Sequence, residues 1–258
     1  RLWEVHSNYT QVPTHAKKTM TKIFTLILCF GIMQATFGQM TTEKEKSLQA
    51  LLDKVVDGKK VFGTSFAFKK DTETWQGASG NLTTDRPYFI ASTTKLFTTA
   101  IIMKLRAEGK LSLEDKISKY IDASILSGLH FYKGKDYSQE LTIRHLLSHT
   151  SGLPDYFQDK GASGKSLENE LMAGNDQFWT FEESIDRSKK MSPLFVPGTK
   201  GKAKYSDANF QLLGKIIETI TDKSYAENCQ DRIIQPLSLT KTYLYQDKKK
   251  EKPKMLYP

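Results

Sequence analysis

The sequence predicts an α+β fold in which an antiparallel hairpin precedes a mostly helical region. Apolar residues recur at helical spacing over residues 42–58, which indicates a first helix. Residues 61–68 and 73–80 instead alternate between apolar and polar side chains on either side of Lys70-Asp71, a pattern typical of two strands joined by a turn. After a further helix, described below, residues 110–236 are expected to form mostly helices and loops.

The N-terminal region has the features of a secretory signal peptide. Lys22 follows Met20, an apolar run covers residues 23–33, and small residues such as Gly38 precede Gln39. An apolar core of about a dozen residues is too short to span a bilayer. The pattern therefore predicts an exported protein, located in the periplasm or secreted by a bacterium.

This interpretation divides the chain into three parts. We expect residues 1–19 to be unstructured translated upstream sequence, residues 20–38 to be removed, and residues 39–258 to form a single domain. Leu28 is bulky for the position before Cys29, which argues against a lipid anchor. No stable membrane insertion is expected once the signal peptide has been removed.

The basic charge of the chain does not indicate a nucleic-acid partner. The net charge of +9 falls to +6 for residues 39–258, because residues 1–38 carry four basic side chains and one acidic one. The basic side chains are spread over predicted helix surfaces and the lysine-rich run 248–254, whereas nucleic-acid binding needs a basic patch with stacking aromatics. Cys229, the one cysteine left after export, is expected to be a small buried hydrophobic residue.

The tetrad Ser92-Thr93-Thr94-Lys95 is a candidate activated nucleophile. Positions i and i+3 share one face of a helix, so the amine of Lys95 can reach the hydroxyl of Ser92. A serine hydroxyl needs a nearby base, and a lysine can be that base if burial lowers its pKa. The alternative interpretation is an N-capping serine followed by a surface lysine.

The residues after this tetrad favour a helix that packs into a core. Gly109 is a suitable stop, and the apolar stripe before it consists of Leu96, Phe97, Ala100, Ile101 and Leu105. A second tetrad, from Ser238 to Lys241, follows Pro236 and is expected in a turn and a short extended segment. The context therefore favours Ser92.

Two segments further along the chain complete a pattern. Residues 141–154 open with Thr142 as the expected N-cap and end at a Gly with Pro beyond it. Residues 197–210 contain Tyr205-Ser206-Asp207, and a helical run follows with Leu212, Leu213, Ile216, Ile217 and Ile220. Together with the first tetrad, these segments resemble the serine β-lactamase and penicillin-binding family, specifically its class C, D-Ala-D-Ala carboxypeptidase and esterase branch. The resemblance runs from about Gly63 to Leu244.

The resemblance implies roles for four residues. Ser92 would be the acylated nucleophile and Lys95 its proton-relay partner. Tyr205 matches the tyrosine of the family's Tyr-x-Asn motif, and with Lys95 it would carry the serine proton to the leaving group. Asp207 stands where that motif usually has Asn. An ionised Asp only accepts hydrogen bonds, whereas Asn can donate one to a substrate carbonyl, so we expect Asp207 to contact substrate and to affect substrate choice.

The family's third motif, Lys-Thr-Gly or His-x-Gly, is missing from the sequence. The nearest match is Lys241-Thr242-Tyr243, which resembles the segment upstream of that motif. The resemblance implies an antiparallel sheet flanked by helices, a mostly helical subdomain facing it, and an active site in the cleft between them. We expect the C-terminal strands of that sheet, with one oxyanion-hole donor, to be missing, which leaves an open sheet edge.

No metal or other cofactor is expected. His145 and His149 lie four residues apart, but Leu146 stands where zinc motifs of that spacing carry Glu. The preferred interpretation is that these histidines shape a helix end near the site. Residues 161–174 are rich in Gly, Ser and Asn and are predicted to be a mobile loop near the site.

The sequence therefore predicts an exported serine hydrolase that forms an acyl-enzyme at Ser92. Its partner would be a small-molecule or peptidoglycan-derived substrate, and β-lactams, D-Ala-D-Ala peptides and esters all remain open. The alternative from another class is a non-catalytic penicillin-binding or sensor module, or an inactive fragment. An intact Lys/His-x-Gly motif downstream would favour the enzyme.

Overall fold

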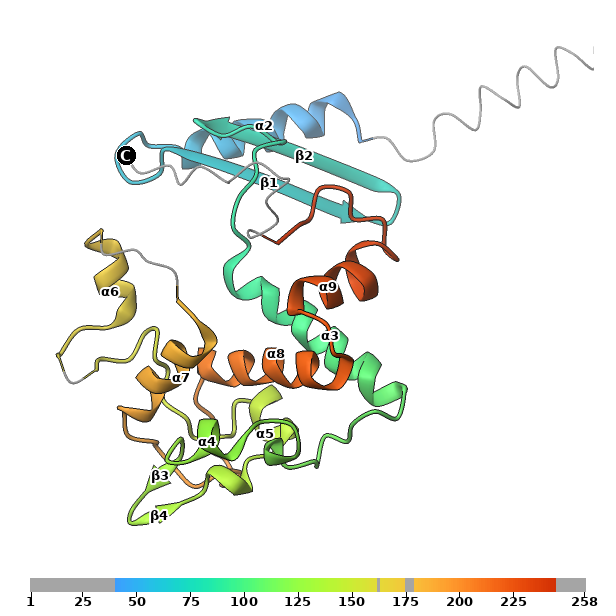
Figure 1. The fold of residues 1–258 in the computed structure, drawn as a ribbon. Helices are drawn as coiled ribbons and strands as arrows, with labels where there is room; N and C mark the ends of the chain where they lie inside the picture. The colour runs from blue at the N-terminus through green and yellow to red at the C-terminus, as the bar shows by residue number, and fades with distance from the viewer. Residues whose placement is uncertain (1–39, 162, 175–178, 245–258) are drawn as a thin grey trace, which may run out of the picture. The chain divides into compact units, whose positions relative to one another are not determined.

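The computed structural model describes residues 40–161, 163–174 and 179–244 (Figure 1). Within them the chain forms two compact units, the first ending at Tyr88 and the second beginning at Phe89. The predicted signal peptide and the lysine-rich run 248–254 lie outside the described residues. No helix in the described part is long and apolar enough to cross a membrane.

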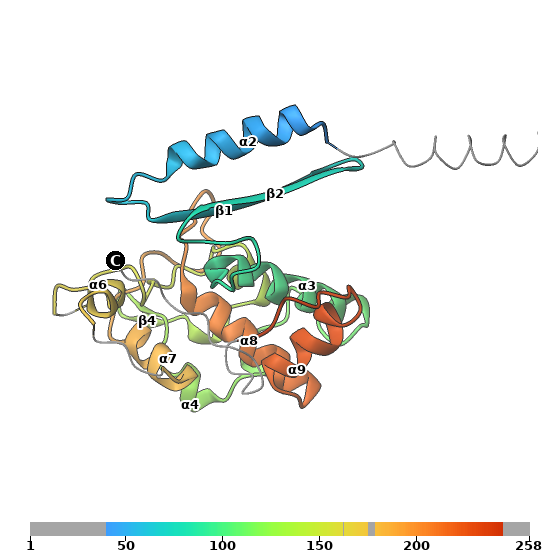
Figure 2. The same cartoon turned by 90° about the horizontal axis from the view of Figure 1, so that it is seen from above.

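The first unit consists of helix α2 (Thr42–Val55) and the hairpin of strands β1 (Gly63–Lys70) and β2 (Glu73–Gly80). Figure 2 shows α2 running along the hairpin, and the Gln49 side chain of α2 donates a hydrogen bond to the carbonyl of Ala78. The predicted hairpin is confirmed. Its turn lies at Asp71, whose φ of 52° places it in the left-handed region.

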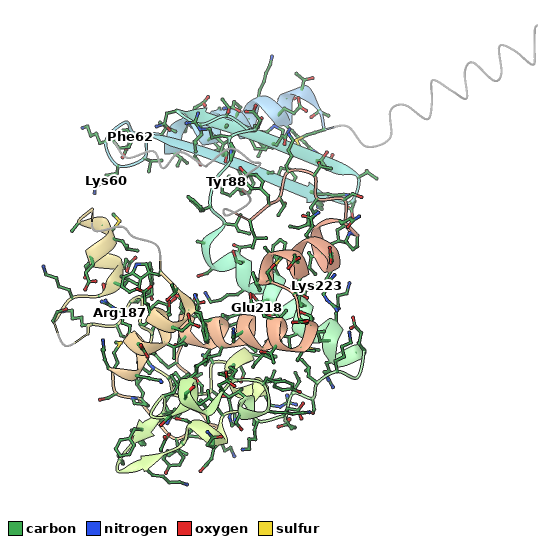
Figure 3. All side chains as sticks on the ribbon, in the orientation of Figure 1. Lys60, Phe62, Tyr88, Arg187, Glu218 and Lys223 are labelled. Atoms are coloured by element: carbon green, nitrogen blue, oxygen red, sulfur yellow. The ribbon has the colours of Figure 1, made fainter. Side chains whose placement is uncertain are left out.

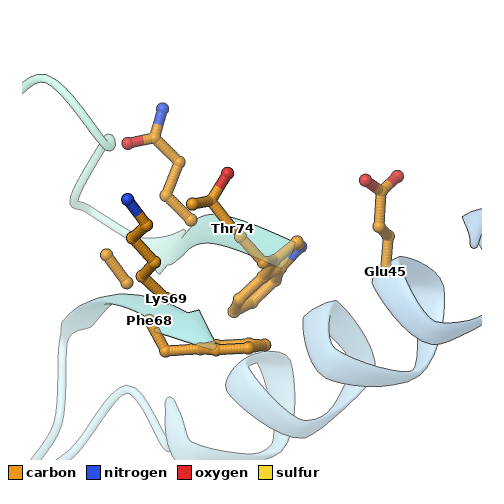
Figure 4. Close-up of a pocket in the computed structure, with 7 residues that line it drawn as sticks. Glu45, Phe68, Lys69 and Thr74 are labelled. Carbon is orange, nitrogen blue, oxygen red and sulfur yellow. The ribbon is translucent and has the colours of Figure 1, made fainter. Parts of the chain in front are cut away.

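The two strands are paired so that Phe68 lies opposite Trp75, with their ring centroids 6.3 Å apart. Among the described residues this sheet has no further strand. Glu45 of α2 and residues of both strands, including Lys69 and Thr74, line an open hollow of about 800 Å³ (Figure 4).

The second unit is built around helix α8 (Asp207–Thr221), which contacts helices α3 (Thr94–Ala107), α5 (Ile143–Leu147), α7 (Phe181–Lys189) and α9 (Tyr225–Cys229). Apolar side chains from all these helices form one core, which includes Ile101, Leu105, Leu146, Ile185, Leu212, Leu213, Ile216, Ile217 and Cys229. The predicted stripe of α8 and the burial of Cys229 are therefore confirmed. Burying such side chains is the main source of stabilisation for this unit.

Helix α3 follows a 3-10 turn at Ala91–Thr93 and ends before Gly109, close to the predicted bounds. One member of its predicted apolar stripe is wrong, because the side chain of Leu96 is 68% exposed. The inward face instead follows the i, i+3, i+4, i+7 spacing of an amphipathic helix and consists of Thr98, Ile101, Ile102 and Leu105.

Helix α5 begins as predicted at the N-cap Thr142, whose hydroxyl accepts the backbone N–H of His145. It ends at Leu147, five residues before Gly152. The chain then turns through His149 with φ 56° and Gly152 with φ 79°. A Cβ at Gly152 would lie 2.1 Å from the carbonyl oxygen of Phe195, so only glycine fits there.

The predicted mobile loop at 161–174 is wrong in part, because it contains helix α6 (Leu167–Met172). Ser166 caps α6, Leu167 is buried, and Glu170 accepts two hydrogen bonds from Arg187 of α7 (labelled in Figure 3) at 2.9 and 3.1 Å. The pattern of small polar residues concealed a short capped helix that tertiary contacts stabilise.

The remaining elements are short. Strands β3 (Phe131–Tyr132) and β4 (Lys135–Asp136), of two residues each, form a small antiparallel hairpin that the sequence did not predict. Helix α4 (Ala123–Leu126) precedes this hairpin. Glu218 of α8, labelled in Figure 3, accepts the backbone N–H of Tyr225 at 2.9 Å and so connects α8 with α9.

Candidate active site

The structure brings Ser92, Lys95 and Tyr205 together within the second unit. Ser92 lies in the 3-10 turn that precedes α3, and Lys95 lies in the first turn of α3. Oγ of Ser92 is 2.8 Å from Oη of Tyr205 and 3.2 Å from Nζ of Lys95. The residue before Ser92, Ala91, has a φ of 44°, which is a costly backbone conformation for a residue with a Cβ.

Asp207, the first residue of α8, closes this arrangement into a ring of four hydrogen bonds. Its Oδ1 lies 2.5 Å from Nζ of Lys95 and accepts the hydroxyl of Tyr205 at 3.2 Å. Each of the four side chains therefore contacts two of the others in the same ring. All four predicted site residues are adjacent in space, although Ser92 and Tyr205 are 113 positions apart in the sequence.

Lys95 is a cation in this environment. Burial alone lowers the pKa of Lys95, but the hydrogen bond with Asp207 and the negative charge of that carboxylate, together with a contribution from nearby Tyr205, outweigh burial, so the pKa is raised above its usual value. The sequence left open whether burial would lower the pKa of Lys95 enough to make it a neutral base, and the raised pKa favours the cation. The side chain instead acts as an ammonium donor toward Ser92 and Asp207.

His149 is a site residue whose role the sequence did not specify beyond shaping a helix end. Its ring stacks on that of Tyr205, with centroids 4.7 Å apart and an interplanar angle of 27°. His145 does not share this position, because its Nδ1 accepts the backbone N–H of Thr142 and completes the capping box of α5. Among the described residues, no cluster of His, Cys, Asp and Glu side chains could hold a metal ion.

Asp155 is a second residue that sequence reasoning missed. It is almost fully buried, and its Oδ1 accepts the backbone N–H groups of Asp207 at 3.3 Å and Phe157 at 3.1 Å. Burial raises the pKa of Asp155. The signal available in the sequence was the position of His149 and Asp155 at either end of the Thr-Ser-Gly-Leu-Pro segment that follows α5.

The second tetrad does not take part in this arrangement. Ser238 lies in a turn with a φ of 52°, as the sequence predicted. Of the two serines, it is Ser92 that the structure joins to Tyr205 by a hydrogen bond.

The sequence and the fold are similar to those of known proteins. Residues 48–258 match the family model described as Beta-lactamase. The chain belongs to the β-lactamase family. The mixed α and β fold predicted for this family from the sequence is confirmed.

Curated relatives and solved structures in this family cover part of the chain. Protein flp of Staphylococcus aureus (strain MRSA252) is 34% identical over 169 residues, which are 64% of this chain and 29% of that protein. A putative D-alanyl-D-alanine carboxypeptidase of Escherichia coli (strain K12) is 32% identical over 161 residues, 62% of this chain and 34% of that protein. The chain thus spans about a third of the length of these relatives.

Two solved structures show the same fold. A D-stereospecific amidohydrolase from Streptomyces sp. has a TM-score of 0.62 and 28% identity, covering 76% of this chain and 55% of that one. The octameric penicillin-binding protein homologue from Pyrococcus abyssi has a TM-score of 0.62 and 29% identity, covering 83% and 47%.

Proposed function

We propose that the protein is an exported serine acyl hydrolase in which Ser92 attacks a carbonyl and forms an acyl-enzyme. The observation that carries the proposal is the closed ring of hydrogen bonds through Ser92, Lys95, Asp207 and Tyr205. It combines a nucleophile, an adjacent oxygen that can take its proton, and a cation that stabilises developing negative charge. Relatives named as a carboxypeptidase and an amidohydrolase support hydrolysis.

The acylation step follows from these contacts. Oγ of Ser92 forms a bond to the carbonyl carbon while its proton moves to Oη of Tyr205, whose own hydroxyl proton passes to Oδ1 of Asp207. The ammonium of Lys95 lies 4.9 Å from the centroid of the Tyr205 ring and 3.2 Å from Oγ of Ser92, where it stabilises the negative charge that develops during the proton transfer. Tyr205 then passes the proton to the leaving group as the carbonyl re-forms, and water hydrolyses the acyl-enzyme.

The candidate substrates are β-lactams, D-Ala-D-Ala peptides and small esters. Asp207 is the residue through which this choice is made, because its carboxylate takes the place of an amide donor beside Ser92. The ion pair with Lys95 also supports a second candidate, a penicillin-binding or sensor module, because an engaged ammonium is less available to assist hydrolysis of the acyl-enzyme.

The nucleophile can be tested by covalent labelling of the intact protein. We expect a fluorophosphonate or fluorescent penicillin probe to label Ser92, and Ser92→Ala to abolish labelling. Ser238→Ala is the matched control, since it removes the serine of the second tetrad, and it should label like the wild type. Labelling that survives in Ser92→Ala, or that maps to Ser238 by intact-protein mass, would contradict the assignment.

Turnover and export need separate measurements. A time course of intact mass after addition of an ester or β-lactam distinguishes a hydrolase, whose adduct disappears, from a sensor module, whose adduct persists. N-terminal sequencing of the exported protein tests the predicted processing site, with Gln39 as the expected first residue.

A further inference from the structure

His149 is linked to the start of α8 by three hydrogen bonds. Its carbonyl accepts the backbone N–H of Lys204 at 2.9 Å. Its Nδ1 lies 3.2 Å from the backbone nitrogen of Ser206 and 3.0 Å from Nδ2 of Asn209. The Tyr205 backbone is therefore held on both sides by the same histidine.

These contacts determine the protonation state of the ring. The amide of Asn209 has a defined orientation, because its Oδ1 accepts the hydroxyl of Ser151 at 2.7 Å and so turns Nδ2 toward His149. Nδ1 of His149 thus faces two N–H donors and must be an acceptor, which leaves the ring proton on Nε2. Only the neutral ring satisfies this network.

The same ring supports the side chain of Tyr205. It stacks on the phenol, and it also packs against Phe210 with centroids 5.4 Å apart. α8 has no cap from the side chain of its own N-cap residue, because the hydroxyl of Ser206 donates to the carbonyl of Pro154 instead. The position of Tyr205 therefore depends on neighbours outside α8.

We propose that His149, as a neutral ring, is a positioning residue that holds Tyr205 against Ser92. The inference rests on the proposed function of Ser92. His149 does not act as the base itself, because its Nδ1 is engaged by Ser206 and Asn209 while the serine hydroxyl contacts Tyr205 and Lys95. It acts through the angle and distance of the phenol.

Protonation of His149 disrupts this support. A proton on Nδ1 would face two N–H donors, so the bonds to Ser206 and Asn209 would break. The charged groups that face the ring are Lys95 of α3 and Asp207 of α8. Burial and the Lys95 ammonium lower the pKa of His149, and together they outweigh the opposite effect of Asp207. His149 therefore becomes protonated, and its support of Tyr205 is lost, only at a pH below the ordinary histidine value near 6.5.

The test compares two variants of the intact protein across pH. His149→Asn keeps a short-range acceptor and tolerates the positive φ of this position, but it loses the stack. His149→Phe keeps an aromatic ring but loses the acceptor. His145→Asn is the matched control, because it replaces the other histidine of the same segment. The measured quantity is the rate constant for fluorophosphonate labelling of Ser92 between pH 5 and pH 9.

We expect the wild type and His145→Asn to lose labelling rate as pH falls below about 6.5. Both His149 variants should label at least tenfold more slowly at pH 8, because misplacement of a catalytic group by about 1 Å costs up to about a hundredfold in rate. The labelling rate that remains in these two variants should not show the decrease at acid pH that the wild type shows, because the histidine that causes it is absent. An unchanged rate and an unchanged acid limb in His149→Asn would overturn the proposal.

A spectroscopic measurement separates this inference from the proposed function. In wild-type protein labelled with ¹⁵N-histidine and ¹³Cζ-tyrosine, we expect an unprotonated Nδ1 on His149 at pH 7.5. On acidification the Tyr205 resonance should move with the His149 midpoint. This result stands even if Ser92 is not labelled by any probe, in which case the proposed function alone fails. A protonated Nδ1 at pH 7.5, or independent midpoints, would refute the positioning role.

Discussion

Replacing Asp207 by Asn removes the carboxylate that holds Lys95, and we expect it to change which carbonyl Ser92 attacks fastest. In the structure this carboxylate forms a 2.5 Å ion pair with Lys95, and the two side chains are only 18% and 21% exposed. The amide of Asn removes a negative charge and introduces two N–H donors. One of these can reach a substrate carbonyl beside Ser92.

The magnitude follows from the bond that is introduced. A hydrogen bond between two neutral groups contributes about 0.5–1.5 kcal/mol, which corresponds to about two- to tenfold in rate. A penicillin-type substrate is an anion and a simple ester is neutral, so loss of the carboxylate favours the former. We therefore expect β-lactam acylation to rise by about tenfold relative to ester hydrolysis.

The assay measures a chromogenic β-lactam and a chromogenic ester side by side on the intact protein. Asp231→Asn is the control, because it removes the same charge from a 2.7 Å ion pair with Lys223 outside the site. An unchanged ratio of the two rates in Asp207→Asn, or an equal change in Asp231→Asn, would refute the reasoning and place Asp207 away from the substrate.

The same substitution has a consequence for pH dependence. The hydrogen bond and charge of Asp207 raise the pKa of Lys95, so the ammonium is favoured in the folded protein and is lost only as pH rises through that raised pKa. Without Asp207, burial lowers the pKa of Lys95 with less opposition. The alkaline limb of ester hydrolysis should therefore move to lower pH in Asp207→Asn, and a limb that does not move would contradict the assignment of Lys95 to it.

Three predictions concern stability, each measured as the free energy of unfolding in denaturant. Leu212→Ala should lower this free energy by about 2–5 kcal/mol because Leu212 is fully buried. Leu96→Ala should change it by less than about 0.5 kcal/mol. Similar losses in the two variants would mean that Leu96 is buried in the native protein. Thr142→Ala should remove the cap of α5 and cost about 1 kcal/mol, and no loss would show that the cap is dispensable. His130 is fully buried, and its ring nitrogens have no hydrogen-bond partner among the described residues. Burial lowers the pKa of His130, so its contribution to the free energy of unfolding is present above about pH 6.5 and is lost as pH falls. His130→Gln should flatten that acid dependence, and an equally steep loss in the variant would assign it to other groups.

Local pattern was sufficient for the elements whose signals lie within a few residues. The alternating hairpin, the Thr142 cap and the apolar stripe of α8 were all predicted, because strand alternation, capping and helical periodicity depend on neighbours in sequence. The family resemblance then selected Ser92, Lys95, Tyr205 and Asp207. The structure places these four side chains in mutual contact, and their catalytic roles remain predictions.

Other features depended on neighbours that are distant in sequence. Leu96 belongs to an apolar run but lies outside the core, because the inward face of α3 is set by contact with α8 and α9. The helix within residues 161–174 escaped prediction because its stability comes from Leu167 and the Glu170–Arg187 pair rather than from its own composition.

The chemistry of the site shows the same division most clearly. The sequence by itself determined which residue types occur and in what order, so it identified a serine, a lysine, a tyrosine and an unusual aspartate. The tertiary structure decided that Asp207 engages Lys95 and raises its pKa, and that the ring of His149 stacks on Tyr205. A pKa and a ring stack depend on distances between side chains, and the fold sets those distances between residues up to 113 positions apart.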